Sequence, residues 1–397
     1  MARKFRIGFI GGGCDSFSGE FHRKAIAQSG IGDIVCGAFG ATRNSSFVTG
    51  KAMGLPVSRV YGTYRDLFRC ESKLAEDERA DFVVVLTPSG MHYPICTAAI
   101  DAKIPVFCEK PFANNVDEAV MLYKKLMATQ LPYGLASVYA GYPALQTMRQ
   151  RMIEGQLGNI RKVIVSAFLG WMTQRIENNG NRQAAWRTDP RRAGATGCLQ
   201  DLGVHCYLLT AWLTGLGIKE LCAELEHVVP GRVLDDDCAV QIRFNNGAVG
   251  SFLCSQVACG EQEGLSFKVY GDKASFHWRQ AEPHLFRVLS VDGHEEIVSV
   301  GAACADEAPL SCAAPFRVDA AYIQALASAY QSFAAYLRDP AAARAAPGGL
   351  GFATPEEGLH SVVFTHAGVR NATPLDPNLP MLKWTPFVVP DIQPRLN

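Results

Sequence analysis

The chain has 397 residues, which is too long for one ordinary domain and predicts two. Hydrophobic residues make up 48% and charged residues 19%, a composition typical of a globular protein. Lys and Arg together number 38, as do Asp and Glu, so the net charge is +0 at pH 7. This balance excludes the basic excess that is typical of nucleic-acid-binding proteins, and we expect no nucleic-acid partner.

The 13 cysteines show no disulfide framework, because no CxxC occurs and their spacing is irregular. Several lie inside apolar runs, such as Cys36 and Cys108, where a thiol serves as a small core residue. We therefore expect free thiols in a reducing, cytoplasmic protein. The apolar part of the opening MARKFRIGFI is too short for a secretory leader, and no apolar run approaches about 18 residues, so no membrane segment is expected.

The first third of the chain alternates short apolar strands with helices. Strands are predicted at 5–10, 33–39, 80–88, 104–111 and 131–137, and helices at 20–28, 93–103 and 116–130. This alternation indicates one parallel sheet with right-handed crossovers. Residues 1–137 are therefore predicted to form a doubly wound Rossmann domain, an α/β fold that binds ligands beyond the carboxyl ends of its strands.

From residue 138 the pattern changes, and residues 138–397 are predicted to form a second, α+β domain. A helix is expected at 142–155 and a strand at 160–171, then a polar stretch at 173–196 and a helix at 202–215. Strands with alternating apolar residues follow at 238–244, 248–258, 265–280 and 284–293, with a hairpin turn at Asn245-Asn246-Gly247. These segments predict a large, mainly antiparallel sheet. The segment 340–351, rich in Ala, Pro and Gly, is expected to be a surface loop.

The segment GFIGGGCDSFSGEFHRKA, residues 8–25, lies between the first strand and the first helix. Gly11 and Gly13 match the usual dinucleotide-binding spacing, but Ser16 stands where the third glycine is expected, and the next glycine is Gly19. A turn at this place can bind a pyrophosphate on backbone N–H groups. The alternative is a glycine-rich turn without a ligand, and the surrounding alternation of strands and helices favours the cofactor loop.

The residues after the second strand are expected to contact the ribose of the cofactor. An acid there would favour NAD by accepting a hydrogen bond from the 2′-hydroxyl. This chain instead has Phe39 and Gly40, followed by Thr42 and Arg43. Taken alone, Arg43 favours a 2′-phosphate and hence NADP, and the alternative is an arginine that faces solvent.

Three motifs then occur in a fixed order: TPSGMHYPIC at 87–96, CEKP at 108–111 and GCLQDLGVHCYLL at 197–209. Together they resemble the Gfo/Idh/MocA family of pyranose and inositol dehydrogenases, over essentially the whole chain. The long opening loop with His22, and the segments YAGYP, QAAWRTDP and VYGDKASFHW, are similar to the branch of levoglucosan dehydrogenase and related sugar dehydrogenases. The resemblance implies that the lengthened loop binds a cofactor, and it favours NAD over NADP.

Oxidation of a secondary alcohol needs a base for the hydroxyl proton while hydride leaves to the nicotinamide. Lys110 ends a predicted core strand, whereas Asp201 and His205 lie four apart on one predicted helix and so share a face. The resemblance implies that these residues form the catalytic group, with His205 as acid/base, Lys110 as electrostatic partner and Asp201 as orienter and substrate ligand. The alternatives are a solvated lysine, a core histidine and a helix cap. Leu208 replaces a second acid found in many relatives.

Other residues are expected to line the site. Glu109 is expected near the cofactor, and His92 either near the nicotinamide ribose or as a helix cap. Trp186 offers a stacking surface for a sugar, while Arg187 and Asp189 offer hydrogen bonds. The predicted cofactor-binding residues are Gly11, Gly13, Cys14, Asp15, Ser16, Phe17, Thr42, Arg43, Thr87, Pro88, His92, Glu109, Lys110, Trp186 and Arg187. The predicted substrate-binding residues are Lys110, Tyr139, Trp171, Gln183, Trp186, Arg187, Asp189, Asp201 and His205.

No metal is predicted, because the nine histidines show no ligand spacing and the acidic run 235–237 is more typical of a turn. Three functions stay open: an NAD(P)-dependent dehydrogenase of a sugar, anhydrosugar, glycoside or inositol, a glycosidase that uses NAD transiently, and a non-catalytic dinucleotide-binding regulator. The presence of Lys110, Asp201 and His205 argues against the regulator. Apolar residues on both faces of the second sheet, together with the resemblance, imply a homodimer or homotetramer through that sheet.

Overall fold

The computed structural model describes residues 3–14, 16–262, 264–301, 318–373 and 383–390. The chain divides into two compact units, of which the first contains Met1–Gly141 and Val318–Gly358 and the second Tyr142–Cys304 and Leu359–Asn397. The first domain was predicted to end at residue 137, and everything after it was assigned to the second. The structure differs mainly because residues 318–358 return to the first unit. No local sequence pattern indicates this return.

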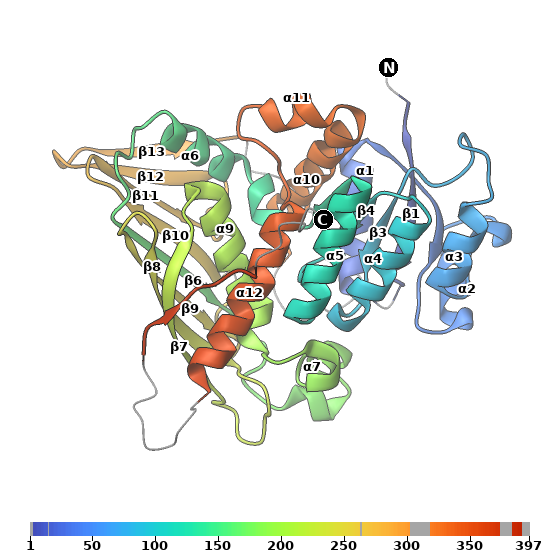
Figure 1. Cartoon of the computed structure of the whole chain (residues 1–397), viewed down its shortest axis with the longest axis horizontal. Coiled ribbons are helices and arrows are strands. Elements are labelled where there is room, and N and C mark those ends of the chain that lie inside the picture. The colour runs from blue at the N-terminus through green and yellow to red at the C-terminus, as the bar shows by residue number, and fades with distance from the viewer. Residues whose placement is uncertain (1–2, 15, 263, 302–317, 374–382, 391–397) are drawn as a thin grey trace, which may run out of the picture. The chain divides into compact units, whose positions relative to one another are not determined.

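The first unit is built on one parallel sheet (Figure 1), in the order β2-β1-β3-β4-β5. The described strands are β1 (Phe5–Gly11), β2 (Gly32–Ala38), β3 (Phe82–Leu86), β4 (Val106–Cys108) and β5 (Tyr133–Leu135). All residues of β3 are buried, which explains its unbroken apolar sequence. The predicted Rossmann fold is confirmed, and the segment predicted at 131–137 contains β5 in a sheet of five described strands.

The helices of the first unit come from both ends of the chain. They are α1 (Phe17–Ser29), α2 (Arg43–Ala52), α3 (Tyr64–Glu71), α4 (His92–Asp101), α5 (Val116–Thr129), α10 (Ala320–Arg338) and α11 (Pro340–Ala345). Helix α10 packs on α1, where the rings of Phe21 and Tyr322 lie 5.4 Å apart. The segment 340–351 was expected to be a loop, yet its first half is α11, whose Ala343 is buried. Alanines favour a helix here, and Asp339 caps it.

The second unit is built on a larger sheet, in the order β13-β12-β11-β10-β6-β9-β8-β7-β14. Its strands are β6 (Lys162–Phe168), β7 (Ile218–Glu226), β8 (Asp237–Phe244), β9 (Val249–Ser255), β10 (Gly264–Tyr270), β11 (Ala274–Arg279), β12 (Leu285–Ser290), β13 (Glu295–Ser299) and β14 (Thr385–Pro386). Neighbouring strands are antiparallel, except that β6 and β9 run parallel. The predicted mainly antiparallel sheet is confirmed.

One face of this sheet is covered by helices. The unit contains α6 (Pro143–Ile153), α7 (Arg182–Arg187), α8 (Pro190–Ala193), α9 (Val204–Thr214) and most of α12 (Pro355–Ala372). Phe252 of β9 and Tyr207 of α9 both contact Phe364 of α12, at ring distances of 5.8 and 5.1 Å. The alternation of β9 turns Phe252 and Cys254 towards this face and leaves Leu253 half-buried on the other.

A buried carboxylate holds the region around the end of β2. Glu71 is fully buried and accepts hydrogen bonds from the guanidinium of Arg59 at 2.9 and 3.0 Å, the hydroxyl of Tyr61 at 2.7 Å and the backbone of Ala80 at 2.8 Å. Burial, and then the hydrogen bond to Glu71, raises the pKa of Tyr61. The backbone of Tyr61 in turn donates to Gly37 in β2, so this cluster supports the carboxyl end of that strand.

Replacing Glu71 by Ala is expected to lower the free energy of unfolding by about 3 kcal/mol, because Arg59 loses its counter-charge and two further donors, the Tyr61 hydroxyl and the Ala80 N–H, lose their acceptor. Urea unfolding followed by circular dichroism measures the change. The control is Glu78→Ala at an exposed site nearby, for which a change within about 0.5 kcal/mol is expected. Equal effects of both substitutions would contradict the structural role of Glu71.

Candidate functional site

The turn after β1 has the backbone conformation of a phosphate-binding loop. Gly11 and Gly12 have φ of +82° and +67°, in the left-handed region that favours glycine. A Cβ on Gly11 would lie 2.7 Å from the Leu86 carbonyl oxygen, and a Cβ on Gly19 would overlap the Gly12 carbonyl. The late glycine therefore lets the first turn of α1 approach the loop. Gly13, which the spacing had singled out, has no positive φ, and Gly12 takes that role.

Several predicted cofactor ligands use their side chains within the protein. Ser16 caps α1 by accepting from the backbone N–H of Gly19 at 3.3 Å, and Thr42 caps α2 by accepting from Ser45 at 3.1 Å. The backbone N–H of Cys14 donates to Thr49 at 3.2 Å. Phe17 begins α1, and Asp15 lies outside the described residues. The side chains of Ser16 and Thr42 are thus engaged as helix caps.

The carboxyl end of β3 offers an unpaired polar atom. Thr87 follows β3, and its hydroxyl oxygen is buried with no hydrogen-bond partner within the described residues. Pro88 precedes the short helical turn Ser89–Met91. A buried hydroxyl without a partner is unfavourable unless another molecule supplies the hydrogen bond. Together with the left-handed glycines after β1, Thr87 fits a dinucleotide at this edge of the sheet.

His92 is enclosed rather than directed at a ligand. It is 1% exposed, its Nδ1 lies 2.7 Å from the Pro111 carbonyl oxygen and its Nε2 lies 2.9 Å from the Thr87 carbonyl oxygen. Burial lowers the pKa of His92 against the opposing effect of these carbonyls. Both ring nitrogens thus lie by backbone carbonyl oxygens, and the expected contact with the nicotinamide ribose stays a prediction. His92 ties together the segments that follow β3 and β4.

Glu109 belongs to a chain of hydrogen bonds that the sequence did not reveal. Its Oε1 lies 2.9 Å from Nε2 of the fully buried His22, whose Nδ1 lies 2.6 Å from the hydroxyl of Tyr330 on α10. Glu109 Oε2 accepts from the backbone N–H of Lys110 at 3.2 Å. Burial raises the pKa of Tyr330, so its hydroxyl stays protonated beside Nδ1 of His22. This chain fixes Glu109 beside the half-buried Lys110, whose peptide bond to Pro111 is cis.

The end of β2 is built without an acid. Phe39 is 1% exposed and packs on Phe9, with ring centroids 6.4 Å apart. Arg43 begins α2 and its guanidinium lies 5.4 Å from the centre of the Phe47 ring. The exposed side of this strand end therefore presents Arg43 and the capping residue Thr42.

In the second unit, five predicted residues meet around one ion pair. Arg187 Nε donates to Asp201 Oδ2 at 2.9 Å, and another guanidinium nitrogen of Arg187 donates to Gln183 Oε1 at 2.8 Å. Gln183 Oε1 also accepts from the Trp186 ring nitrogen at 3.0 Å. The guanidinium of Arg187 lies 4.3 Å from the centre of the Trp186 ring and 5.7 Å from that of Trp171. We call Trp171, Gln183, Trp186, Arg187, Asp201 and Gln256 the Arg187 cluster.

Asp201 stands on a widened turn that leads directly into α9. Residues Leu199–Gly203 form a π-helical turn, and His205 follows in the first turn of α9 as a half-buried residue. Asp235 is 5% exposed and holds the start of this turn, accepting from the backbone of Gly197 and Leu199 at 2.7 and 2.9 Å. π-Helical turns are frequent at functional sites, and this one sets the offset of Asp201 from His205.

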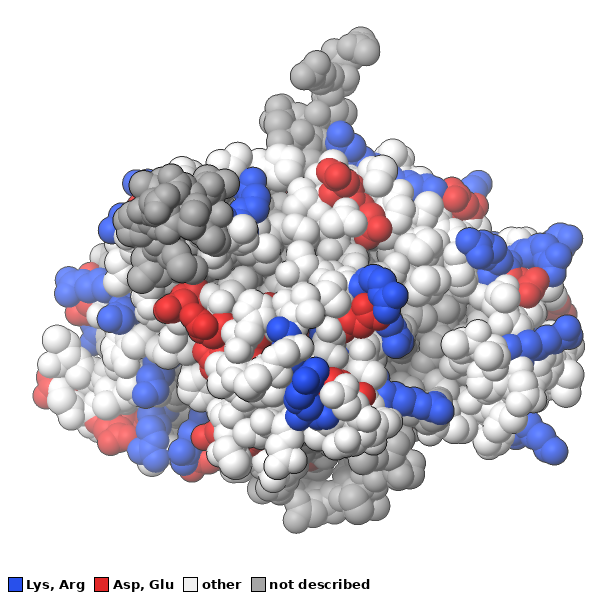
Figure 2. All heavy atoms as spheres, turned by 90° about the horizontal axis from the view of Figure 1, so that it is seen from below, with Lys and Arg blue, Asp and Glu red and all other residues white. Residues whose placement is uncertain are grey.

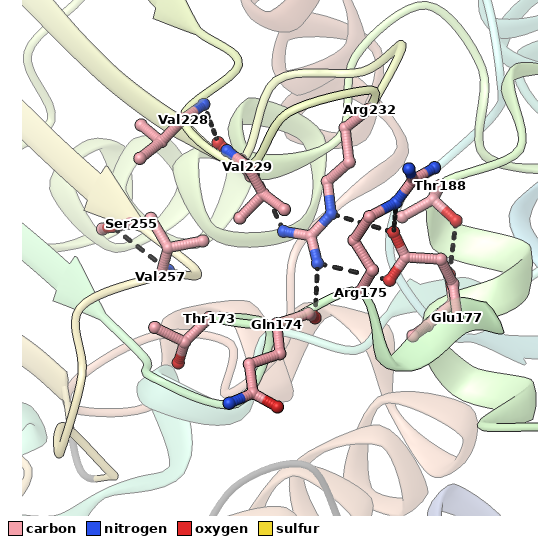
Figure 3. A network of polar contacts seen from close by, with 12 residues as sticks. Thr173, Gln174, Arg175, Glu177, Thr188, Val228, Val229, Arg232, Ser255 and Val257 are labelled. Carbon is pink, nitrogen blue, oxygen red and sulfur yellow. Dashed lines mark hydrogen bonds and ion pairs between the residues drawn. The ribbon is translucent and has the colours of Figure 1, made fainter. Parts of the chain in front are cut away.

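A buried arginine fastens the irregular segment that carries Gln183, Trp186 and Arg187. Figure 3 shows the guanidinium of Arg232 between the carboxylate of Glu177, at 3.1 and 3.2 Å, and the carbonyl of Gln174, at 2.8 Å. Its third nitrogen donates to Asp236 at 3.0 Å, and Asp236 also accepts from the backbone N–H groups of Val228 and Val229. Asp235 and Asp236 thus shape this region as the sequence predicted.

Two other predicted substrate ligands lie elsewhere in their units. Asp189 caps α8, and both of its carboxylate oxygens accept from Arg191, at 3.0 and 2.9 Å. The structure therefore places Asp189 at a helix start, and its carboxylate is held by an exposed arginine. Tyr139 lies in the first unit, in the short helix Val138–Gly141, where it is 8% exposed.

The described residues contain no group of His, Cys, Asp or Glu arranged to hold a metal ion. The cysteines among them are free thiols, as predicted. Within the same part of the chain, no helix is both long and apolar enough to span a bilayer. On the face in Figure 2, basic and acidic side chains are interspersed rather than gathered by sign.

Comparisons with known proteins agree with this geometry. Residues 5–136 match the oxidoreductase family with an NAD-binding Rossmann fold, and residues 145–277 match the GFO/IDH/MocA C-terminal domain. The uncharacterised oxidoreductase YfiI of Bacillus subtilis is 30% identical over 293 residues, which cover 72% of each chain. Levoglucosan dehydrogenase of Pseudarthrobacter phenanthrenivorans is 25% identical over 296 residues, or 69% of this chain and 73% of that protein.

Among solved structures, an inositol dehydrogenase homolog of Azotobacter vinelandii, complexed with NAD⁺, superposes with a TM-score of 0.83 and 27% identity. The match covers 93% of this chain and 95% of that one. The first unit is accordingly an NAD-binding Rossmann domain. With both domain matches in sequence order, the chain belongs to the Gfo/Idh/MocA family of oxidoreductases.

Proposed function

We propose that this protein oxidises a secondary hydroxyl of a sugar, anhydrosugar, glycoside or inositol, with NAD⁺ as hydride acceptor. The observation that carries the proposal is the Arg187 cluster, in which Asp201, one turn before His205, is fixed by charged and polar partners. The names of the relatives support the substrate class, since they include a levoglucosan dehydrogenase and an inositol dehydrogenase homolog.

In this proposal Lys110, Asp201 and His205 form the catalytic group. His205 takes the hydroxyl proton, since an imidazole is the side chain best suited to exchange protons near neutral pH. Lys110 donates a hydrogen bond to the reacting oxygen and stabilises negative charge that develops there. Asp201 orients the substrate, because Arg187 and Gln256 hold its carboxylate in one position. Bound NAD⁺ supplies the hydride acceptor.

The Arg187 cluster favours an uncharged substrate. The guanidinium of Arg187 already donates to Asp201 and Gln183 and stacks on Trp186. A guanidinium with these partners is poorly placed to form a further bidentate contact with a phosphate or carboxylate. Aromatic rings beside hydrogen-bonding groups instead suit a hydroxylated ring.

The deciding experiment is an absorbance screen at the NADH wavelength, with NAD⁺ or NADP⁺ against pyranoses, anhydrosugars, glycosides and inositols. Net formation of reduced cofactor with one of these classes supports the proposal. A glycosidase that uses NAD transiently would need no added cofactor and would release no net NADH. A regulator would bind the cofactor without turnover of any compound in the screen.

Lys110→Ala and His205→Ala are each expected to lower kcat by about a hundredfold or more, the usual contribution of a positioned acid or base. The affinity for NAD⁺, measured by fluorescence titration, is expected to persist because the turn after β1 is unchanged. Lys73→Ala and His294→Ala, at exposed sites, are matched controls with unchanged kcat. Near-wild-type turnover of both catalytic variants would show that the catalytic assignment is wrong.

Arg43→Ala is expected to raise the KM for NADP⁺ about tenfold and to change the KM for NAD⁺ little, since a lost charged hydrogen bond to a 2′-phosphate has about this effect. The control is Arg65→Ala, because Arg65 also lies over a neighbouring ring, at 4.8 Å from Tyr64. Equal loss for both cofactors refutes the 2′-phosphate role, and no change for either places Arg43 in solvent.

We also propose that the protein forms at least a dimer through the open face of its large sheet. Ile164, Leu253 and Tyr270 on this face are only half-buried by the described residues of one chain. A face with such residues is normally covered, and a specific interface buries more than about 1,000 Å².

Light scattering at micromolar concentration is expected to give at least twice the mass of one chain. Leu253→Glu should shift the protein towards the monomer by placing a charge in the interface. Val291→Glu serves as the control, because Val291 is 83% exposed. A wild-type protein with the mass of one chain would sink this proposal.

A further inference from the structure

Gln256 is a buried residue of the Arg187 cluster that the sequence did not single out. It follows β9 directly and is 3% exposed. Its backbone N–H donates to the Asp236 carbonyl at 2.8 Å, and its carbonyl accepts from the N–H of Met172 at 3.0 Å. The backbone is therefore held from two sides, which leaves the side chain little freedom of position.

The orientation of the Gln256 amide follows from its neighbour. Its nitrogen Nε2 lies 3.1 Å from Asp201 Oδ2, where it donates alongside Arg187. A carboxylate only accepts hydrogen bonds, so the amide must present its nitrogen to Asp201 and its oxygen Oε1 elsewhere. Oε1 is buried and has no hydrogen-bond partner within the described residues. An acceptor in this situation is unfavourable until a donor reaches it.

A second unpaired atom belongs to the same cluster. The ring nitrogen of Trp171 is buried without a hydrogen-bond partner in the part of the chain that the structure describes. Trp171 precedes Met172, whose N–H binds the Gln256 backbone, and its ring lies 5.7 Å from the Arg187 guanidinium. The cluster thus offers one unpaired acceptor and one unpaired donor. A hydroxyl group can satisfy either, because it both donates and accepts.

We propose that Gln256 is a substrate ligand whose amide oxygen accepts a hydrogen bond from a hydroxyl next to the one that Asp201 orients. This inference rests on the proposed function. The amide nitrogen and oxygen belong to one small group, so the two substrate hydroxyls that meet Asp201 and Gln256 must be neighbours on the ring. The substrate is therefore an uncharged polyol with adjacent hydroxyls, and Gln256 selects for the second of them. Trp171 donates to a further oxygen of the same molecule.

The experiment measures kinetics of the wild type and of Gln256→Leu with the best polyol from the screen and with its monodeoxy analogues. For the wild type, one analogue next to the oxidised carbon is expected to lose about tenfold in kcat/KM, the effect of an unpaired buried partner. Gln256→Leu should raise the KM for the polyol about tenfold, leave the KM for NAD⁺ unchanged, and lose nothing further on that one analogue.

A residue that only supported Asp201 would lower activity towards the polyol and every analogue alike. Retained discrimination by Gln256→Leu therefore overturns the inference. Gln256→Met, with an unbranched chain of similar length, is a second variant with the same expectations if the leucine variant does not fold. Gln241→Leu is the control, because Gln241 is exposed on β8 of the same sheet and its amide oxygen accepts from Ser251 at 2.7 Å.

The failure of this inference can be told apart from the failure of the proposed function. If the wild type oxidises no polyol with either cofactor, the proposed function is wrong and the inference falls with it. The second case is a wild type that oxidises a polyol and discriminates among its deoxy analogues. If both Gln256 variants discriminate among the analogues in the same way, only the role of Gln256 is overturned.

Discussion

The ion pair between Arg187 and Asp201 is the contact on which the candidate substrate site depends. It joins the short helix α7, in a segment that contains only short helices, to the turn that carries Asp201 and leads into α9. Both side chains are largely buried, at 13% and 17% exposure, so removal of either would leave the other charge poorly solvated. The rings of Trp171 and Trp186 flank the guanidinium, and Gln183 and Gln256 occupy the remaining polar positions.

A second arginine makes this arrangement possible. A polar stretch of this length would be expected to move unless tertiary contacts hold it. Arg232 provides them, because it is 1% exposed and binds Glu177 and the Gln174 carbonyl at one end and Asp236 at the other (Figure 3). Asp235, the neighbour of Asp236, holds the turn with Asp201. The two adjacent aspartates therefore connect both sides of the Arg187 cluster to the start of β8.

The sequence predicted those parts of the fold that have local patterns. Continuous apolar runs identified β1 to β5, and alternation with turn residues identified β8, β9 and β12, because burial on two faces or one leaves these traces. The segment 265–280 was predicted as one stretch, which the structure divides into β10 and β11. The return of 318–358 to the first unit left no local sequence pattern, because the contacts of α10 join residues remote in sequence. Tyr330 is an ordinary aromatic residue of an apolar helix until the fold brings it to His22. Gln256 likewise follows a strand without a motif.

The polar residues predicted as ligands divide according to what stands next to them in the chain. Ser16, Thr42 and Asp189 each precede a helix, and each side chain caps it. A cap and a ligand contact call for the same residue types, so a sequence pattern cannot separate them. By contrast, none of the helices α7, α8 and α9 is capped by Arg187, Gln183 or Asp201. Their side chains remain available to one another, and this is why the candidate substrate site is built from them.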